Sequence, residues 1–376
     1  MKKLLLILLC LPFIGFGQTP IPDANFEQAL INLGYDTGTP DGVVPTANIN
    51  TVTNLHVGSN NISDLTGIED FTALTNLYCQ SNQLTSLDVS DNMALYWLEC
   101  QSNQLTSLDA SNNMALWRLR CYNNQLTSID VSGATTLDRL RCENNQLTSL
   151  DVSTNTALAS LYCHDNQLTS LNVSGATNLT FLRCETNLLT SLDVSTNTAL
   201  YHLECSDNQL TSLDVTNNFA LDNLVCDGNQ LTSLNVTNNS VLENLDCWSN
   251  QLTSLDVSNN GVLNNLECPY NLLTSLDVKN GNNLNFEIGG FFSCHENPYL
   301  TCINVDDAVW STAHWDWIDN QHYFSTNCPV SGIQEHTTNK ELLKVTDLLG
   351  RETKQTNQLL FYIYDDGTVE KRITID

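Results

Sequence analysis

The stretch that decides the fold is NQLTSLDAS (Asn103–Ser111), which returns as NQLTSLDVS (Asn145–Ser153) and, with small changes, along most of the chain. It belongs to a longer unit, L-x-x-L-x-C-x-x-N-x-L-T-S-L-D-V-S-x-N-x-A, seen in Leu95–Ala115. Cysteines mark its period, since they stand at positions 79, 100, 121, 142, 163, 184, 205, 226, 247 and 268, each 21 residues after the one before. A fixed period of this length is typical of a solenoid, in which each repeat forms one coil.

Each unit contains two similar halves, and the alternation in each half predicts one short strand. In the first half Leu98 and Cys100 point inward and Glu99 points outward, while in the second half Leu108 points inward and Asp109 outward. Stacked coils then pair as parallel strands about 4.8 Å apart. One coil cannot bury its apolar side alone, so every coil repeats the residues that contact the same neighbours above and below.

Two asparagines in each unit, Asn103 and Asn113 in Leu95–Ala115, are expected to point inward. We expect each to bond the turn backbone and its own copy in the next coil, because buried polar turn groups need partners.

These residues resemble leucine-rich repeats, whose signature is L-x-x-L-x-L-x-x-N-x-L, with Cys at the third leucine. The resemblance is to a nested 21-residue subclass and covers residues 51–305; a 22-residue repeat at Val52–Leu77 makes the first coil. It implies a leucine-rich repeat solenoid dominated by short parallel β-strands, with an N-terminal capping helix and a small C-terminal β domain. The expected segments are a signal peptide (1–17), an N-terminal cap (18–50), the solenoid (51–305), a C-terminal cap (306–330), a linker (331–339) and a sorting domain (340–376).

The first residues, MKKLLLILLCLPFIGFGQ, place two lysines before an apolar run that ends in small residues. This pattern predicts a secretory signal peptide cleaved before Gln18. The run is too short for a membrane anchor, and a lipoprotein signal at Cys10 is the other alternative. No later segment is apolar enough to cross a membrane, so we expect an exported chain without a transmembrane segment.

Both ends of the solenoid need caps. At the N-terminus, Ile21–Gly34 reads as a helix with Asp23 as its N-cap and Gly34 at its end. At the other end, Cys302 replaces an outward-facing Ser of the repeat and Cys328 follows, which predicts a disulfide that pins the C-terminal cap.

The tail differs in composition from the repeats. A polar linker is followed by residues that alternate as in short strands, with a turn at Asp366-Gly367. KVTDLLGRE (Lys344–Glu352) and DGTVEKRITID (Asp366–Asp376) resemble the short form of the C-terminal sorting domain of the type IX secretion system. That resemblance implies export to the surface of a Gram-negative bacterium through the secretion machinery. A small structural hairpin domain is the alternative.

Three residue patterns raise the question of bound metal. The cysteine ladder replaces leucine at a core position, so core packing is expected, with disulfides or metal as alternatives. The aspartates at 88, 109, 130, 151, 193, 214, 256 and 277 predict a solvated acidic stripe, with calcium binding as the alternative. His295, Glu296, His314, Asp316 and His322 predict an aromatic-rich cap, with a metal site as the alternative. We therefore expect no cofactor and no metal.

The outward positions around each cysteine vary, and they gather the only five arginines between residues 51 and 300. Aromatic residues, which with arginine are enriched at binding hot spots, occupy the same repeats. The predicted ligand-binding residues are Tyr96, Trp97, Trp117, Arg118, Arg120, Tyr122, Arg139, Arg141, Tyr162, Phe181 and Arg183. Sequence drift is the alternative. We expect Arg120 and Arg141 to stack as like charges, so that replacing both leaves thermal stability unchanged or raised.

The predicted function is non-catalytic binding or adhesion by a secreted or cell-surface protein, with a protein or glycan as partner. The net charge of −28 argues against nucleic acid, whose phosphates it would repel. A self-associating surface-layer component is the alternative, although a monomer is expected. A carbohydrate-active enzyme is a further alternative, but the carboxylates lie in flat ladders and no G-x-S-x-G motif is present.

Overall fold

The computed structural model describes residues 17–286, 290–329, 342–346, 351–353, 359–364 and 369–373. They fall into two compact units, Met1–Pro329 and Val330–Asp376. The signal peptide, the linker and the turn at Asp366-Gly367 lie outside the described residues, apart from Gly17. No helix among the described residues is long and apolar enough to cross a membrane.

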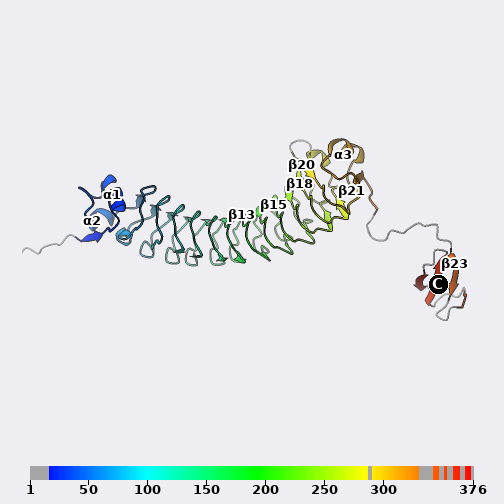
Figure 1. The fold of residues 1–376 in the computed structure, drawn as a ribbon, viewed down its shortest axis with the longest axis horizontal. Helices are drawn as coiled ribbons and strands as arrows, with labels where there is room; N and C mark the ends of the chain where they lie inside the picture. The colour runs from blue at the N-terminus through cyan, green and yellow to red at the C-terminus, as the bar shows by residue number, and fades with distance from the viewer. Residues whose placement is uncertain are drawn as a thin grey trace, which may run out of the picture. The chain divides into compact units, whose positions relative to one another are not determined.

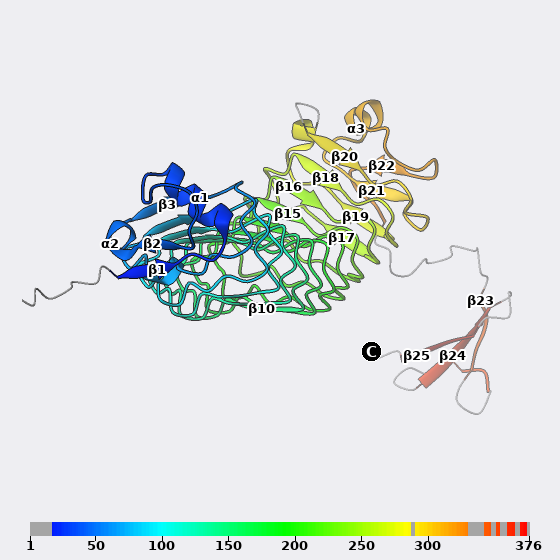
Figure 2. The ribbon, with the colours of Figure 1, turned by 60° about the vertical axis from the view of Figure 1, so that its left-hand side comes forward.

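The first unit is a curved solenoid, and the structure confirms the predicted stack of short parallel strands (Figure 1). One three-residue strand from each coil joins a 12-stranded sheet on the inner side of the curve (Figures 1 and 2). In spatial order its strands are β3 (Asn54–His56), β4 (Asn76–Tyr78), β5 (Trp97–Glu99), β7 (Arg118–Arg120), β9 (Arg139–Arg141), β11 (Ser160–Tyr162), β13 (Phe181–Arg183), β14 (His202–Glu204), β15 (Asn223–Val225), β16 (Asn244–Asp246), β18 (Asn265–Glu267) and β20 (Phe291–Ser293).

The other half of each repeat forms strands in only some coils, which differs from the expectation of one strand per half. Here β6 (Ser107–Asp109) pairs with β8 (Ser128–Asp130), and β10 (Ser149–Asp151) pairs with β12 (Ser170–Asn172). A four-stranded sheet contains β17 (Ser254–Asp256), β19 (Ser275–Asp277), β21 (Cys302–Asn304) and β22 (Tyr323–Ser325). A curved stack spaces its coils more widely on the outer side than on the inner side, which gives a physical reason for the interrupted ladder.

The core consists of the inward residues that the repeat predicts. Leu98 and Cys100 are fully buried, and Leu108 is 3% exposed. The thiols also bond between coils, since Cys100 Sγ lies 3.6 Å from the carbonyl oxygen of Arg120 in the next coil. The cysteines therefore combine apolar packing with weak donation to the backbone.

The inward asparagines are buried and bond turn backbone as expected, and Asn113 contacts the backbone of its own equivalent, Asn92, in the neighbouring coil. Asn103 Nδ2 donates to the carbonyl oxygens of Cys100 in its own coil and Cys79 in the preceding coil, both at 3.0 Å. Asn113 Nδ2 donates to the carbonyl oxygens of Val89 and Asn92, also at 3.0 Å. The side chains bond backbone of the same and the preceding coil, because carbonyl groups left free by the turns face them there.

The N-terminal cap is built around α1 (Ala24–Asn32), and Asp23 is its N-cap as predicted, accepting from the N–H groups of Asn25 and Phe26. Gly34 ends the helix with a φ of 82°, a conformation that glycine adopts at little cost. The cap also contains β1 (Gln18–Pro20), β2 (Val43–Pro45) and α2 (Thr46–Ile49), and η1 (Ile68–Asp70) follows in the first coil. Phe26 is fully buried and packs 6.4 Å from the ring of Phe71.

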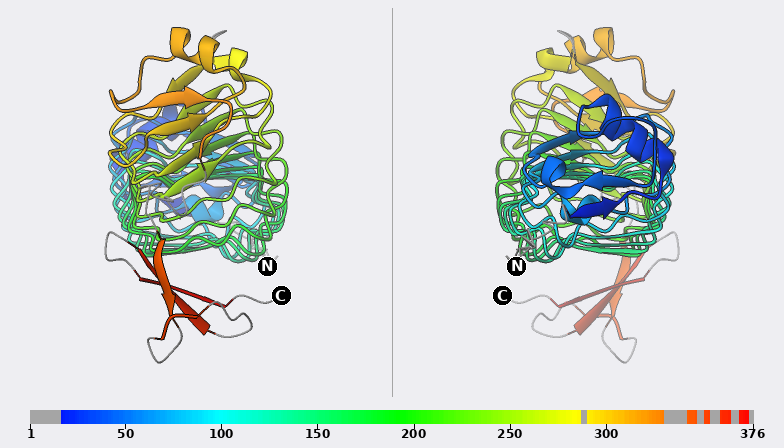
Figure 3. Two further views of the ribbon diagram at one scale, coloured as in Figure 1. Left: turned by 90° about the vertical axis from the view of Figure 1, so that its right-hand side faces the viewer. Right: turned by 90° about the vertical axis from the view of Figure 1, so that its left-hand side faces the viewer.

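The C-terminal cap, with α3, lies at the other end of the solenoid (Figure 3). Its aromatic side chains pack on the core there. After η2 (Asn283–Phe286) and β20, the helix α3 (Ala308–His314) leads to Trp315, which is 6% exposed. Its ring stacks on Phe292 at 4.1 Å and meets Phe286 edge-on at 5.5 Å. Cys302 and Cys328 form a disulfide with their Cα atoms 5.7 Å apart. Cys302 precedes the inward Ile303 and so keeps the outward register of the repeat's Ser, although it is only 8% exposed.

The second unit contains an antiparallel sheet in the order β23 (Leu342–Thr346), β24 (Leu359–Tyr364) and β25 (Val369–Ile373).

Candidate functional site

The candidate site is the solvent side of five consecutive strands, β5, β7, β9, β11 and β13. On each strand the central leucine is buried and its two neighbours face outward, as in Arg118-Leu119-Arg120. In-register pairing places each outward residue beside its equivalent one repeat later, so Arg118 lies opposite Arg139 and Arg120 opposite Arg141. We name this surface the arginine face. It carries Tyr96, Trp97, Trp117, Arg118, Arg120, Tyr122, Arg139, Arg141, Tyr162, Phe181 and Arg183.

Aromatic rings flank the arginines on this surface. Trp117 stacks on Tyr96 at 5.3 Å, and Arg118 lies over the rings of Trp117 and Trp97 at 4.2 and 4.9 Å. Such contacts hold a guanidinium in place without neutralising its charge.

A second group of rings lies toward the following strands. Arg141 lies 4.6 Å from the ring of Tyr122 and 5.2 Å from that of Tyr162, and Tyr162 contacts Phe181 at 5.0 Å. The structure thus brings the predicted aromatic and arginine residues into side-by-side contact across neighbouring repeats.

Three of the five arginines are paired with carboxylates. Arg120 Nη1 lies 2.8 Å from Glu99 Oε1. Arg141 Nε donates to Glu143 Oε1 at 2.8 Å, and Glu143 is almost fully buried. Removing Arg120 and Arg141 would deprive these two buried carboxylates of their ion-pair partners, which is costly, although Trp97 Nε1 would still donate to Glu99 Oε1 at 3.0 Å. These ion pairs argue against the expectation of unchanged or raised thermal stability, which stays a prediction.

The third paired arginine joins two repeats. Arg183 Nε donates to Glu185 Oε1 at 2.9 Å and lies 2.8 Å from Glu204 Oε2. These carboxylates hold the pKa of Arg183 above its ordinary value, although burial acts against them. Glu204 also bonds His202 at 2.7 Å, and its pKa is lowered by that bond first and then by Arg183.

The sheet turns acidic toward its C-terminal strands. Asp246 on β16 lies opposite Glu267 on β18, and Asp227 follows the adjacent strand β15. Burial, followed by repulsion from Asp227 and Glu267, raises the pKa of Asp246 to about 7. Burial also raises the pKa of Asp227, although Ser206 donates a hydrogen bond to it. We name these three carboxylates the acidic end.

Aromatic residues also precede the arginine face, and the sequence interpretation missed them. His56 and Tyr78 stack at 4.2 Å on β3 and β4, and Tyr78 lies 6.0 Å from Trp97. Both stand directly after the inward leucines Leu55 and Leu77, so the repeat alignment could have identified them.

The aspartate stripe of the opposite side has a local structural role. Asp109 Oδ1 accepts from the N–H of Ser111 at 2.8 Å, and hydrogen bonds from Ser111 lower the pKa of Asp109. The same arrangement recurs at Asp88 and Asp193, with Ser90 and Ser195 as donors. The Asp-x-Ser spacing therefore closes a turn in each coil.

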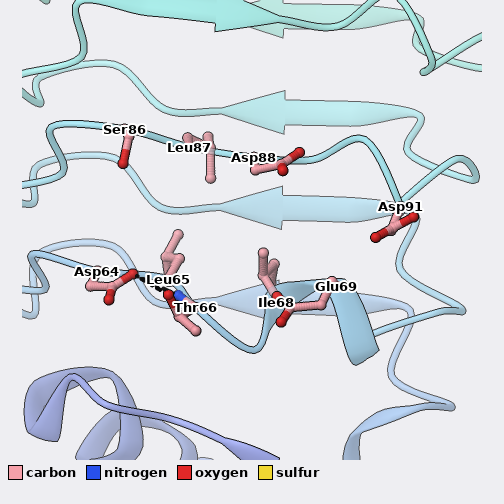
Figure 4. Close-up of a pocket in the computed structure, with 9 residues that line it drawn as sticks. All are labelled: Asp64, Leu65, Thr66, Ile68, Glu69, Ser86, Leu87, Asp88 and Asp91. Carbon is pink, nitrogen blue, oxygen red and sulfur yellow. Dashed lines mark hydrogen bonds between the residues drawn. The ribbon is translucent and has the colours of Figure 1, made fainter.

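A shallow depression on this side is lined by acidic and small polar residues (Figure 4). Its lining residues are Asp64, Leu65, Thr66, Ile68, Glu69, Ser86, Leu87, Asp88 and Asp91. Asp64 Oδ1 accepts from Thr66 N and Glu69 Oε2 accepts from Gly67 N, so backbone groups engage both. Within the described residues, no group of three or more His, Cys, Asp or Glu could hold a metal ion.

The histidines of the C-terminal cap are separated in the structure. His322 is buried, its Nδ1 accepts from Asp319 N at 3.1 Å, and burial lowers its pKa. His314 stacks on Trp310 at 4.3 Å in α3, whereas His295 bonds Ser293 at 2.9 Å beside β20.

Solved structures share this architecture. The functional domain of InlJ from Listeria monocytogenes, which includes a cysteine ladder, is 36% identical with a TM-score of 0.67, covering 77% of this chain and 67% of that chain. An internalin, InlF, from Listeria monocytogenes is 21% identical with a TM-score of 0.54, covering 84% and 99%. A plant peptide hormone receptor, RGFR1, in complex with RGF2 is 17% identical with a TM-score of 0.52, covering 70% and 54%. No protein-family model and no curated protein matches the chain.

Proposed function

The chain belongs to the bacterial leucine-rich repeat proteins, and on that premise we propose that it is a non-catalytic binding protein whose arginine face recognises a protein partner. The observation that carries the proposal is the gathering of all five arginines of residues 51–300 on one surface, where three of them, Arg118, Arg120 and Arg141, lie over aromatic rings. Drift on an unconstrained surface gives no reason for arginine to be confined to one side of a solenoid.

The physical character of the surface supports binding. Its side chains are held by stacking and ion pairs, so a partner meets a preorganised surface and little side-chain entropy is lost. Tyr, Trp and Arg combine a large contact area with polar groups, which is why they dominate binding hot spots. A curved solenoid also offers an extended inner surface to a partner.

The location is also part of the proposal. The signal-peptide pattern of residues 1–17 and the resemblance of residues 340–376 to a type IX sorting domain support export to the outer surface of a Gram-negative bacterium. There the solenoid would meet partners on other cells or in the medium, as an adhesion or recognition module. A glycan partner and a self-associating surface layer are the competing functions.

A chemical cross-linking experiment tests this function. The mature chain is incubated with surface proteins from neighbouring cells and cross-linked, while the same chain is applied to a glycan array. We expect one or a few proteins to be captured by the parent and lost with Trp117→Ala/Tyr162→Ala, but retained with Thr148→Ala on the opposite side. Capture that is equal for all three chains, or binding confined to glycans, would overturn the proposal.

A further inference from the structure

Two arginines of the arginine face lack the carboxylate partners that the other three have. Arg120, Arg141 and Arg183 are each ion-paired. In the part of the chain that the structure describes, neither Arg118 nor Arg139 makes an ion pair, although the chain carries 42 acidic residues. The positive charge left over on this face is therefore concentrated at Arg118 and Arg139.

These two arginines are neighbours. Arg118 on β7 pairs in register with Arg139 on β9, so their backbones lie about 4.8 Å apart. The fold thus carries two side chains of like charge on neighbouring strands, and like charges repel. The Nε atoms of both are buried and have no hydrogen-bond partner. Among the described residues neither arginine stabilises the fold through an ion pair, although Arg118 contacts Trp117 and Trp97, and a ligand would gain two adjacent sets of donors.

The surroundings favour one chemical class of ligand group. Arg118 is already held over Trp117 and Trp97, so its N–H edges and not its faces remain for a ligand. The forked edge of a guanidinium matches the two oxygens of a planar carboxylate. Two such forks side by side fit one carboxylate, or two from neighbouring residues of an extended chain.

We propose that Arg118 and Arg139 form the anchor for an acidic side chain of an extended protein segment that lies across the 12-stranded sheet. This proposal rests on the proposed function and narrows it to two residues. Aromatic rings on both sides, at Trp117 and Tyr162, supply apolar contacts for residues next to the acidic one.

The charges on the other strands of the 12-stranded sheet indicate which charges the bound protein segment should carry beyond its acidic side chain. The net charge of −28 repels a polyanion, so the acidic group is one or two residues and not a long acidic run. The acidic end, with Asp246 and Glu267, lies five and six strands beyond β9 in the same sheet, roughly 24–29 Å away at the usual strand spacing. A partner that reaches this far is expected to carry basic residues there.

The test uses a display library of random dodecapeptides, selected on the mature chain. We expect the enriched peptides to contain Asp or Glu and to lose at least tenfold in affinity, about 1.4 kcal/mol, toward Arg118→Gln/Arg139→Gln. The control, Lys279→Gln, removes a positive charge outside the arginine face, just after β19, and should change affinity less than threefold. Thermal unfolding shows whether each variant is folded, and removal of the like-charged pair should not lower its midpoint.

The outcomes separate this inference from the function on which it rests. Peptides whose binding is lost with Trp117→Ala/Tyr162→Ala bind the arginine face. The inference alone would be overturned if such peptides lack acidic residues, or if their affinity is unchanged by Arg118→Gln/Arg139→Gln. The inference and the proposed function would both be overturned if no peptide is enriched, or if the affinity of the enriched peptides is unchanged by every substitution on the arginine face. Binding of a glucuronate-containing glycan that requires both arginines, without peptide binding, would overturn the choice of a protein partner.

Discussion

The thiol of Cys121 lies 3.5 Å from the carbonyl oxygen of Arg141 in the next coil, which it reaches as a weak hydrogen-bond donor. The same contact joins Cys163 to Arg183 and Cys268 to Ser293, both at 3.5 Å. A leucine would fill the space but could not donate. The cysteine ladder therefore links the buried core of one coil to the backbone of the next.

The first prediction concerns the oxidation state of these thiols. Burial raises the pKa of Cys100 to about 12, so the reactive thiolate is scarce and the ladder should resist oxidation and alkylation. In denaturant without reductant, the mature chain should show eleven free thiols and the Cys302–Cys328 disulfide. Mass spectrometry after alkylation measures this, and reduction beforehand should add two labels. Extensive disulfide bonding within the ladder of freshly purified protein would show the packing account to be wrong.

The second prediction compares two adjacent asparagines. Asn113 is fully buried and donates to two carbonyl groups, whereas Asn112 is exposed. Asn113→Ala removes both donors from buried acceptors and should lower the free energy of unfolding by about 2–4 kcal/mol. Asn112→Ala should change it by less than about 0.5 kcal/mol. Urea denaturation of both variants tests this, and equal effects would contradict the structural role of the inner asparagine.

The third prediction concerns the pH dependence of stability. The pKa of Asp246 is raised to about 7 in the folded protein, so between about pH 4 and pH 7 the folded state binds more protons at this site than the unfolded state. The contribution of this group to stability is thus fully present at low pH and is lost as the pH rises through 7. Asp246→Asn should stabilise the protein at about pH 8 and reduce the change in melting temperature between about pH 5 and pH 8.

Asp165→Asn provides the control for this pH effect, because Asp165 is exposed and its equivalents in the neighbouring coils, Asn144 and Thr186, carry no carboxylate. Melting curves of the three proteins should differ only for Asp246→Asn. A parent protein that becomes steadily more stable from about pH 5 to pH 8, with no change on substitution, would refute the assigned repulsion at the acidic end.

The fourth prediction concerns export. A chain without residues 340–376 should keep the melting temperature of the solenoid, because Met1–Pro329 forms a compact unit of its own. In the producing bacterium this truncated chain should accumulate inside the outer membrane. Immunolabelling of intact cells measures surface display, and normal display of the truncated chain would refute the sorting role.

Much of the fold could be predicted because the chain contains ten copies of one unit, and each copy shows the same pattern of inward and outward residues. The inward register of Leu98 and Cys100 follows from alternation alone, and the pairing of Arg118 with Arg139 follows from the period. The bonding of the asparagines to turn backbone could be predicted from their burial, but the particular carbonyl groups could not, since several lie within reach of one amide. The interrupted outer strands depend on the curvature of the whole stack, which no single repeat encodes.

The charge state of the candidate site was the part that sequence reasoning described least well. Glu99 and Glu143 were evident as neighbours of the arginines, but ion pairing depends on side-chain direction. Glu143 follows Arg141 by two residues on the same coil, whereas Glu99 on β5 lies directly opposite Arg120 on the adjacent strand β7. The directions of these side chains distinguish the ion-paired arginines from Arg118 and Arg139. They therefore decide which residues a binding experiment should substitute.

Site-specific photo-cross-linking in the native setting tests the central claim most directly. A photoreactive phenylalanine derivative replaces Tyr122 on the arginine face or, as the control, the exposed Thr148 on the opposite side. Irradiation of intact cells together with their natural neighbours should give a discrete protein adduct from position 122 and none from position 148. An adduct from position 148 alone would contradict the account, as would a position-122 adduct that persists unchanged after Arg118→Gln/Arg139→Gln substitution.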